Sequence, residues 1–375
     1  MFWKRRTYLD CAAGFAGNPS SPHEEGRRAK KMLEDARTTI ARLVEVQSDD
    51  VIFTSGATES NALAILGHVR ALRLLAGNDA PGRNNMHVLY LSSAHASIVE
   101  NMKVLADEGV ETEELPLKDY CVDTEKLAKM LRPETVLVSM DAVCGETGVV
   151  WNTRVVSQAI GSKIMLHVDA SQAPLTEKIS RAHFDADMLT FDASKVGENR
   201  GVGVLIAHRK IPIVPLYKGG GQERGLRPGS EVPELAQMFA AALRAAVRTR
   251  EAFRASAEKN RQRLIARIRS AIQNVLVQEG HTQAPNILNL SLPGRDTDYI
   301  IALLDEAGFA LSSRSACETD SEEGSRVVLA LTGDEERARS TLRISWGQSI
   351  RARELARFAK ELARAVAFID NSKLR

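Results

Sequence analysis

One lysine follows an apolar stretch at a place where its amine could act as a nucleophile. The apolar run 188–191 predicts a buried strand that ends at Asp192, and Ser194 and Lys195 follow where the strand opens into a glycine-containing turn. A lysine that is partly removed from water has a lowered pKa, and its neutral amine can attack a carbonyl carbon. A solvated loop lysine is the plain alternative, so other segments have to decide between the two.

A carboxylate upstream favours the chemical interpretation. The run 166–168 predicts a second buried strand, with Asp169 at its carboxyl end and Gln172 three residues later. Ligand sites of open α/β sheets gather at such strand ends. A carboxylate can keep a pyridine nitrogen protonated, and the Gln172 amide can donate to a phenolic oxygen on the ring. Asp169 and Lys195 together therefore suit pyridoxal 5'-phosphate, an aldehyde cofactor that a lysine binds covalently.

A turn of small residues is a candidate phosphate site. The segment 54–61, which contains Ala57 and Thr58, follows a predicted strand at 51–53 and precedes a helix that we expect over 62–75. Free backbone N–H groups and the positive end of a helix bind phosphate, and the Thr58 hydroxyl can add a hydrogen bond. An ordinary capped helix would have the same residue types.

Two further segments can contribute polar groups to the same site. His95 follows a predicted strand at 87–91 and could stack on a planar cofactor or move a proton, although it could also be structural. The polar loop 219–230 carries Arg224, Arg227 and Ser230, which could contact an anion or lie on the surface.

Cys317 and Arg343 are candidates near the carboxyl end of the chain. Cys317 stands at the base of an acidic, glycine-containing loop, where a thiol would be accessible and reactive, while a buried small apolar residue is the alternative. Arg343 lies in the predicted strand 341–346, and its guanidinium suits a substrate carboxylate or, more plainly, a salt bridge.

The composition sets limits on partners and compartment. The 375 residues include 50 Lys and Arg and 48 Asp and Glu, so the near-zero net charge gives no reason to expect nucleic acid or a membrane surface. We expect no membrane span and no metal ion, and the four scattered cysteines fit a reducing cytoplasm.

Strand and helix patterns alternate through most of the chain, which predicts a doubly wound α/β domain with a mostly parallel sheet. A helical stretch over about 234–273 is expected to bridge to a smaller α+β domain. We therefore expect a large domain over 15–255, and a small domain over 256–375 that also includes residues 1–14. The remaining elements are expected as strands at 8–10, 111–115, 136–140, 202–207 and 285–292 and as helices at 24–44, 96–105, 124–131, 154–160, 299–307 and 351–369.

Taken in order, these segments resemble the cysteine desulfurases of the class V aminotransferase family. The matching stretches are Tyr8-Leu-Asp, Gly17-Asn-Pro-Ser-Ser, Phe53-Thr-Ser-Gly-Ala-Thr-Glu-Ser, His167-Val-Asp-Ala-Ser-Gln, Gly219-Gly-Gly-Gln-Glu-Arg-Gly, Ala284-Pro-Asn-Ile-Leu and Ser313-Arg-Ser-Ala-Cys. The resemblance implies a fold-type I pyridoxal phosphate homodimer that converts L-cysteine to L-alanine and passes the sulfur to an acceptor or scaffold protein. The long loop is similar to that of the mobile-loop subgroup.

The resemblance also implies a role for each matching residue. Catalysis would fall to Lys195, which binds the cofactor, to His95, which stacks on the ring, and to Cys317, which carries a persulfide. The other cofactor contacts would be Asp169 and Gln172 at the ring, and Ala57, Thr58, Ser194 and the partner subunit's copy of Ser230 at the phosphate; Arg343 and Asn18 would bind substrate.

Several positions depart from the family's pattern. Gly145 replaces an asparagine that contacts the cofactor, Ser194 replaces a histidine, and Asp192 replaces a serine near the phosphate, where its charge would repel unless it turns away. Gln222 replaces a histidine, and residues 11–16 replace a Thr-Thr-Pro signature. The departures leave two alternatives open: another fold-type I lyase or aminotransferase, or a weakly active paralogue that serves as a binding partner in sulfur assembly.

Overall fold

A seven-stranded sheet forms the centre of the protein. The computed structural model describes residues 6–15, 17–77, 85–313 and 324–372. The sheet order is β1-β9-β8-β7-β6-β2-β3. The strands from β8 to β3 pair in parallel, and only β9 runs antiparallel to its neighbours β8 and β1. The predicted mostly parallel α/β sheet is confirmed, with bounds β1 Val51–Thr54, β2 His87–Tyr90, β3 Glu111–Glu114, β6 Thr135–Asp141, β7 Met165–Asp169, β8 Met188–Asp192 and β9 Gly203–Ala207.

The strand directions bring the predicted site segments to one edge of this sheet. Because β9 is antiparallel to both β1 and β8, those two strands point the same way and their carboxyl ends flank the start of β9. In the register, Gly203 of β9 pairs with Thr54 on one side and Asp192 on the other. The next two strands end at Asp169 and Asp141, which are also a register pair.

The helices follow the apolar periodicity of the sequence. One boundary was predicted wrongly, because the helix expected from residue 62 begins at Ala57: α2 (Ala57–Ala62) continues through a π-helical turn at Leu63–Gly67 into α3 (His68–Ala76). Thr58 therefore lies in the first helical turn. The others are α1 Glu24–Val44, α4 Ala96–Asp107, α5 Thr124–Met130, α6 Thr153–Ile160, α7 Arg181–Phe184, α8 Pro233–Ala271, α9 Thr297–Glu306, α10 Arg326–Thr332, α11 Glu335–Arg339 and α12 Ala352–Ser372.

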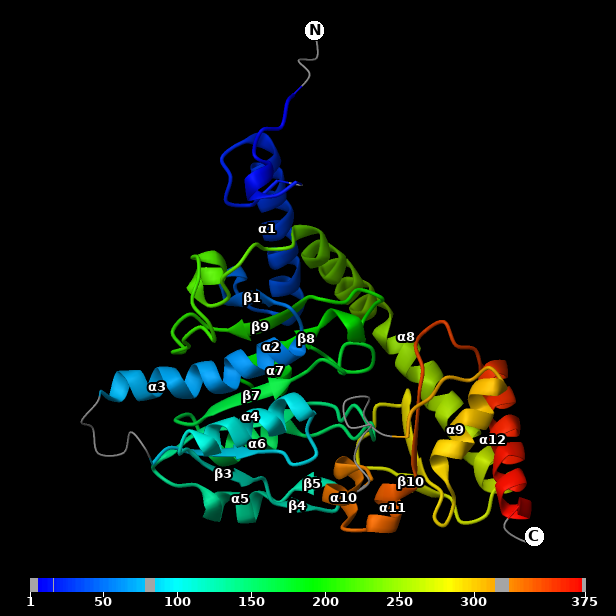
Figure 1. Cartoon of the computed structure of the whole chain (residues 1–375). Coiled ribbons are helices and arrows are strands. Elements are labelled where there is room, and N and C mark those ends of the chain that lie inside the picture. The colour runs from blue at the N-terminus through cyan, green and yellow to red at the C-terminus, as the bar shows by residue number, and fades with distance from the viewer. Residues whose placement is uncertain (1–5, 16, 78–84, 314–323, 373–375) are drawn as a thin grey trace.

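Two apolar cores share the long helix α8. Phe239 and Leu243 pack into the core around the large sheet, whereas Leu264 and Ile268 pack into a second core. The second core lies under an antiparallel sheet of β10 (Leu276–Gln278), β11 (Ile287–Ser291) and β12 (Thr341–Ser345) and includes α9 and α12. Figure 1 shows α8 running diagonally from the large sheet to α9 and α12. From these two cores we propose a domain boundary within α8, near residue 255.

The described part of the N-terminal segment contacts the start of α1, on the side of the large sheet. From the sequence we expect this segment to belong to the small domain. Asp10 accepts hydrogen bonds from Ser21 and His23 just before α1, and Arg6 pairs with Glu25 at its start. Residues 8–10 form no strand, which corrects that prediction, because these polar contacts take the place of strand pairing. The described start of the chain therefore lies beside α1 (Figure 1).

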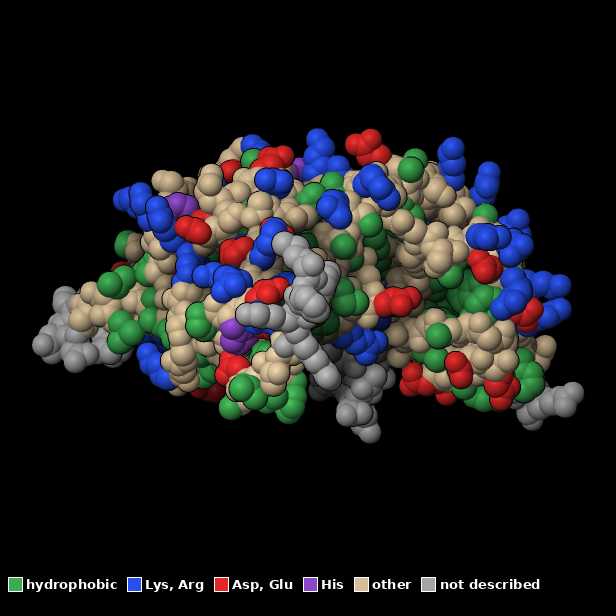
Figure 2. Space-filling model, turned by 90° about the horizontal axis from the view of Figure 1, so that it is seen from above, with side chains coloured by type: hydrophobic (Ala, Val, Ile, Leu, Met, Phe, Trp, Pro, Cys, Tyr) green, Lys and Arg blue, Asp and Glu red, His purple; other side chains and the backbone are tan. Residues whose placement is uncertain are grey.

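The surface mixes charges of both signs. Figure 2 shows basic and acidic side chains interspersed over the face seen from above, in keeping with the near-neutral composition. Among the described helices, none is long and apolar enough to cross a bilayer.

Candidate active site

Asp169 is a buried carboxylate at the carboxyl end of β7, 6% exposed. Its Oδ1 accepts a hydrogen bond from the Ser171 backbone N–H at 2.9 Å, and its Oδ2 accepts one from the Asn61 amide at 2.8 Å. Both oxygens thus accept hydrogen bonds that fix the orientation of the carboxylate. An oriented carboxylate at a strand end can accept a hydrogen bond from the nitrogen of a pyridine ring.

Asn61 links this carboxylate to His95. Its Nδ2 also donates to Ser97 Oγ at 2.9 Å, and Ser97 Oγ lies 2.8 Å from His95 Nδ1. The Ser97 backbone N–H donates to the same ring nitrogen at 3.1 Å. Since Nδ1 accepts these bonds, the proton of the neutral ring resides on Nε2. The network fixes the histidine tautomer, and Nε2 of the exposed His95 ring remains able to donate a proton.

Two further titratable groups are buried beside Asp169. Burial and the Asp169 charge raise the pKa of Asp141 to about 8, so Asp141 is protonated at neutral pH. Burial lowers the pKa of His167 to about 4, and its ring lies 2.8 Å from Ser139 Oγ and 3.1 Å from Thr190 Oγ1. Asp169 therefore has neutral neighbours on its own strand and on β6.

Lys195 ends a 3-10 turn, Ala193–Lys195, directly after β8. Its side chain is exposed in the single chain, so the burial expected from the adjacent strand is absent: the strand ends at Asp192 and the turn carries the lysine outward. Asp192 caps this turn, because its Oδ1 accepts from the Ser194 N–H at 2.8 Å and from the Ser194 hydroxyl at 2.6 Å. Ser194 is thus directed to Asp192.

We call the turn 54–61, the candidate phosphate site, the phosphate cradle. Two of its backbone amides donate hydrogen bonds to protein carboxylates. Asp192 Oδ2 accepts from the Ala57 N–H at 2.8 Å, and Glu59 Oε2 accepts from the Ser55 N–H at 2.6 Å. Arg227 contacts Glu59 Oε1 at 3.3 Å, so this loop arginine pairs with a protein carboxylate. Phosphate binding like that of the family would require Asp192 to turn away from the cradle. The Asp192 side chain instead points toward it.

Gly145, Gln172 and Arg343 lie together at the ends of β6 and β7. A Cβ on Gly145 would be 3.2 Å from Gln172 Nε2, so the side chain of Gln172 covers the position of the missing asparagine side chain. Arg343 donates to the Gly145 carbonyl at 3.3 Å and to Ser312 Oγ at 3.4 Å. β12 of the small core thus brings a guanidinium to the predicted cofactor ring.

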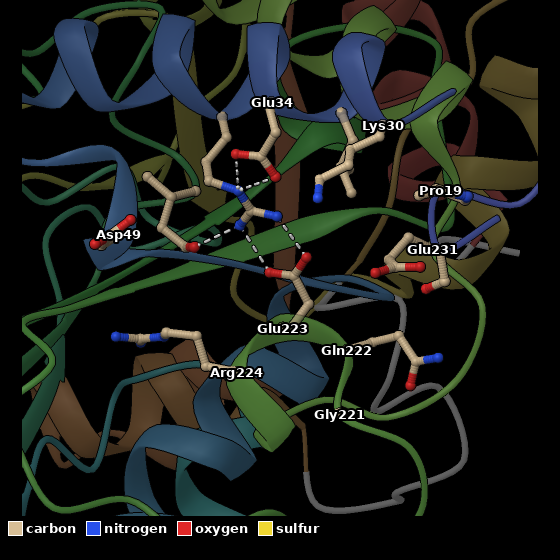
Figure 3. A pocket seen from close by; sticks show the side chains of 13 residues that line it. Pro19, Lys30, Glu34, Asp49, Gly221, Gln222, Glu223, Arg224 and Glu231 are labelled. Atoms are coloured by element: carbon tan, nitrogen blue, oxygen red, sulfur yellow. Dashed lines mark hydrogen bonds and ion pairs between the residues drawn. The ribbon is translucent and has the colours of Figure 1, made fainter. Parts of the chain in front are cut away.

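The loop that carries Ser230 is fastened to α1 and β1. Glu223 is buried with positive φ (46°), and its carboxylate binds Arg37 at 2.6 and 2.8 Å and the Phe53 N–H at 2.8 Å. Figure 3 shows this ion pair at the wall of a cavity of about 410 Å³ between α1 and the loop. Arg224, a candidate anion contact from the sequence, lines this cavity, whereas none of the described residues assigned to cofactor or substrate by the family resemblance does. Ser230 itself is exposed.

The remaining predicted residues are separate or outside the described ranges. The Asn18 side chain is bonded to its own turn, through the Ala13 carbonyl and the Ser20 N–H. Cys317 lies outside the described residues. Cys144 is buried, which raises the pKa of its thiol to about 12, whereas Cys11 and Cys121 are exposed. Among the described residues, no three His, Cys, Asp or Glu side chains are arranged to hold a metal ion.

Comparisons with known proteins identify the family of this chain. A family profile described as Aminotransferase class-V matches residues 7–358. The chain belongs to this family. It is 33% identical over 335 residues to cysteine desulfurase IscS 1 of Archaeoglobus fulgidus, covering 88% of this chain and 85% of the relative. It is 31% identical to cysteine desulfurase IscS of Pseudoalteromonas translucida, covering 89% and 82%.

Solved structures of relatives share the fold. A NifS-like protein superposes with a TM-score of 0.84 at 26% identity, covering 94% of this chain and 92% of that one. DndA from Streptomyces lividans superposes with a TM-score of 0.74 at 31% identity, covering 90% and 94%. This chain of the class V aminotransferase family therefore has the fold-type I architecture of pyridoxal phosphate enzymes.

The side chains fit the ring of that cofactor better than its phosphate. Asp169 and Gln172 come from the end of β7, Lys195 follows the adjacent β8, and His95 follows β2, with β6 between β7 and β2. At the predicted phosphate end, Ala57 and Thr58 lie in the first turn of α2, and the Ala57 amide is bound to Asp192. Sequence reasoning overlooked Asn61, although it lies one helical turn after Ala57, a spacing that places it on the same helix face.

Proposed function

We propose that this chain is a pyridoxal phosphate-dependent cysteine desulfurase. The observation that carries the proposal is the buried Asp169 carboxylate, oriented by Asn61 and Ser171, on the strand next to the one that Lys195 follows, in a chain of the class V family. The cofactor, when bound, supplies a protonated ring that stores negative charge. Lys195 holds the aldehyde carbon, Asp169 the ring nitrogen, and Gln172 the ring oxygen.

The chain's own groups then divide the work on L-cysteine. Arg343 would bind the substrate carboxylate, Lys195 would take up the α-proton at its Nζ, and His95 would give or take a proton at Nε2. The Cys317 thiolate attacks the substrate sulfur, so the substrate's C–S bond breaks as an S–S bond forms. A proton added at the β-carbon and a proton returned to the α-carbon complete alanine, and the persulfide on Cys317 retains the sulfur; no external oxidant is required.

Further features of the proposal come from the family resemblance. The enzyme acts as a homodimer in which Ser230 reaches the partner subunit's phosphate site, works in the cytoplasm, and passes persulfide sulfur to an acceptor or scaffold protein for iron-sulfur cluster or thio-cofactor synthesis. A relative from Saccharomyces cerevisiae is named a mitochondrial cysteine desulfurase, so the proposed cytoplasmic location separates this chain from that relative.

Cysteine turnover with matched cysteine variants tests the proposal. The wild-type protein, reconstituted with pyridoxal phosphate, is expected to release sulfide and alanine in equal amounts from L-cysteine in the presence of a dithiol. Cys317→Ala should lose sulfide release while retaining the cofactor, and Cys121→Ala, an exposed-thiol control, should keep it. Full activity in Cys317→Ala would favour another lyase or aminotransferase of the same fold.

A second candidate function has one specific observation in its favour. The Asp192 contact with Ala57 is what a chain with a weakened cofactor site would have, as in a paralogue that serves as a binding partner in sulfur assembly. A colourless protein that takes up neither pyridoxal phosphate nor pyridoxal on Lys195 would favour this alternative over catalysis.

A further inference from the structure

The carboxylate of Asp192 accepts a hydrogen bond from the first amide of the helix at the predicted phosphate site. The helical segment that begins at Ala57 runs without a break to Ala76, and its first amide donates to Asp192 Oδ2 at 2.8 Å. A helix N-terminus binds anions through such amides. Here the anion is supplied by the chain itself.

The local backbone makes this contact a built feature of the fold. Asp192 pairs with Gly203, and a Cβ on Gly203 would lie 2.7 Å from Gly56, so the cradle turn packs directly on β9 between β1 and β8. Gly56 has a φ of 153°, and a Cβ there would lie 3.2 Å from Asp192 Oδ2. Two glycines thus let the carboxylate approach the helix end closely.

Both Asp192 oxygens are engaged. While Oδ2 binds the Ala57 amide, Oδ1 accepts from the backbone and hydroxyl of Ser194, the residue before Lys195. Glu59, in the same helical turn, adds a second carboxylate on the Ser55 amide. A phosphate dianion entering this turn meets negative charge and amides that already have acceptors.

We propose that Asp192 is an internal competitor for the phosphate subsite, so that this chain gains little affinity from the phosphate of its cofactor. The inference rests on the proposed function, because it concerns the same cofactor site. Its consequence is that pyridoxal and pyridoxal phosphate bind with similar affinity, both through the ring contacts and Lys195. Removing the Asp192 charge should restore a preference for the phosphorylated form.

Equilibrium titration of apoprotein with the two cofactors tests this directly. Visible absorbance of the lysine-bound cofactor gives each dissociation constant for wild type, Asp192→Asn and Asp192→Ser. Both variants should bind pyridoxal phosphate on the order of tenfold more tightly than wild type, since a charge-assisted acceptor and a like charge are removed. Their affinity for pyridoxal should stay within about twofold of wild type, because the ring contacts and Lys195 are unchanged.

The matched control is Asp123→Asn. Asp123 also caps a helix, with its carboxylate accepting from the Lys126 N–H, but on α5, beside β3 at the other end of the sheet (Figure 1). This variant should leave both dissociation constants unchanged. A parallel change for both cofactors in the Asp192 variants, or a wild-type preference of a hundredfold or more for the phosphorylated form, would overturn the inference.

Inorganic phosphate provides a second readout that requires no cofactor. Millimolar phosphate should raise the melting temperature of Asp192→Ser apoprotein and leave that of wild type and Asp123→Asn unchanged. An equal rise in wild type would contradict competition by Asp192. The proposed function is tested separately, by borohydride trapping of pyridoxal on Lys195: trapping in wild type supports the active site, whatever the phosphate result.

Discussion

The Asn61 side-chain amide joins Asp169 to the hydrogen-bond network of His95. Its two N–H groups donate to Asp169 Oδ2 at 2.8 Å and to Ser97 Oγ at 2.9 Å. The two sides of the predicted cofactor ring are therefore oriented by a single residue on α2. Both contacts are buried, so packing sets their geometry and solvent screens their electrostatic interaction little.

Replacing Asn61 should disturb both ends of this network at once. We expect Asn61→Ala to lower kcat about 10- to 100-fold, because a supporting hydrogen bond to a functional carboxylate is lost and the Ser97–His95 contact is no longer held. Steady-state sulfide release measures the effect, and the cofactor absorption band should shift as well. Asn101→Ala is the control, since the Asn101 side chain donates to the Ser97 carbonyl, at 2.6 Å, and not to the Ser97 hydroxyl that contacts His95; equal losses in the two variants would contradict the assigned role.

Asp141 should make stability depend on pH. Burial and the neighbouring Asp169 raise its pKa from 3.8 to about 8, so the folded protein retains a proton that the unfolded chain has already lost. The contribution of this proton to the free energy of unfolding is fully present below pH 4. It decreases as the pH rises toward 8, by at most about 1.4 kcal/mol per pH unit.

The isosteric variant Asp141→Asn tests this sign, because it retains the shape and carries no titratable proton. Urea unfolding at several pH values should show a flatter dependence between pH 5 and 8 than wild type, with the largest gain in unfolding free energy at pH 8. Asp305→Asn, an exposed change on α9, should follow wild type. An unchanged pH slope in Asp141→Asn would rule out the buried protonated carboxyl.

The sequence predicted the large sheet because its strands are short apolar runs between amphipathic helices, and Asp169 and Lys195 followed from the ends of two such runs. The sequence did not predict that β9 is antiparallel. A strand buried on both faces has the same apolar sequence pattern whether it is parallel or antiparallel to its neighbours. α10 and α11 were missed because helices of seven and five residues are too short for a clear periodicity. The Asp192–Ala57 bond joins residues 135 positions apart, so only the folded sheet reveals it.

The buried pair of Arg37 and Glu223 should be important for stability. Their side chains are 11% and 2% exposed, and Glu223 also binds the Phe53 N–H just before the cradle. Glu223→Ala removes the buried carboxylate partner of Arg37 and leaves it with the half-exposed Glu34 and the Val51 carbonyl, so we expect a loss of about 3–5 kcal/mol in unfolding free energy. Glu34→Gln, which removes the exposed partner of Arg37, should cost less than about 1 kcal/mol. Similar losses in both variants would contradict a buried pair that fastens the Ser230 loop.

Arg343 should determine how strongly the substrate carboxylate is bound. Its guanidinium is held by the Gly145 carbonyl and Ser312 Oγ, which orients the fork at the end of β6. Lysine preserves the charge but cannot form two parallel bonds to a carboxylate, so Arg343→Lys should raise KM for L-cysteine on the order of tenfold, with a smaller effect on kcat. Arg339→Lys, whose arginine pairs with Glu335 on the surface of α11, is the matched control and should keep the wild-type KM. A fall in kcat at constant KM would instead place Arg343 in the chemical step. In that case Arg343→Lys should slow the turnover of cysteamine, which lacks the carboxylate, as much as it slows the turnover of L-cysteine.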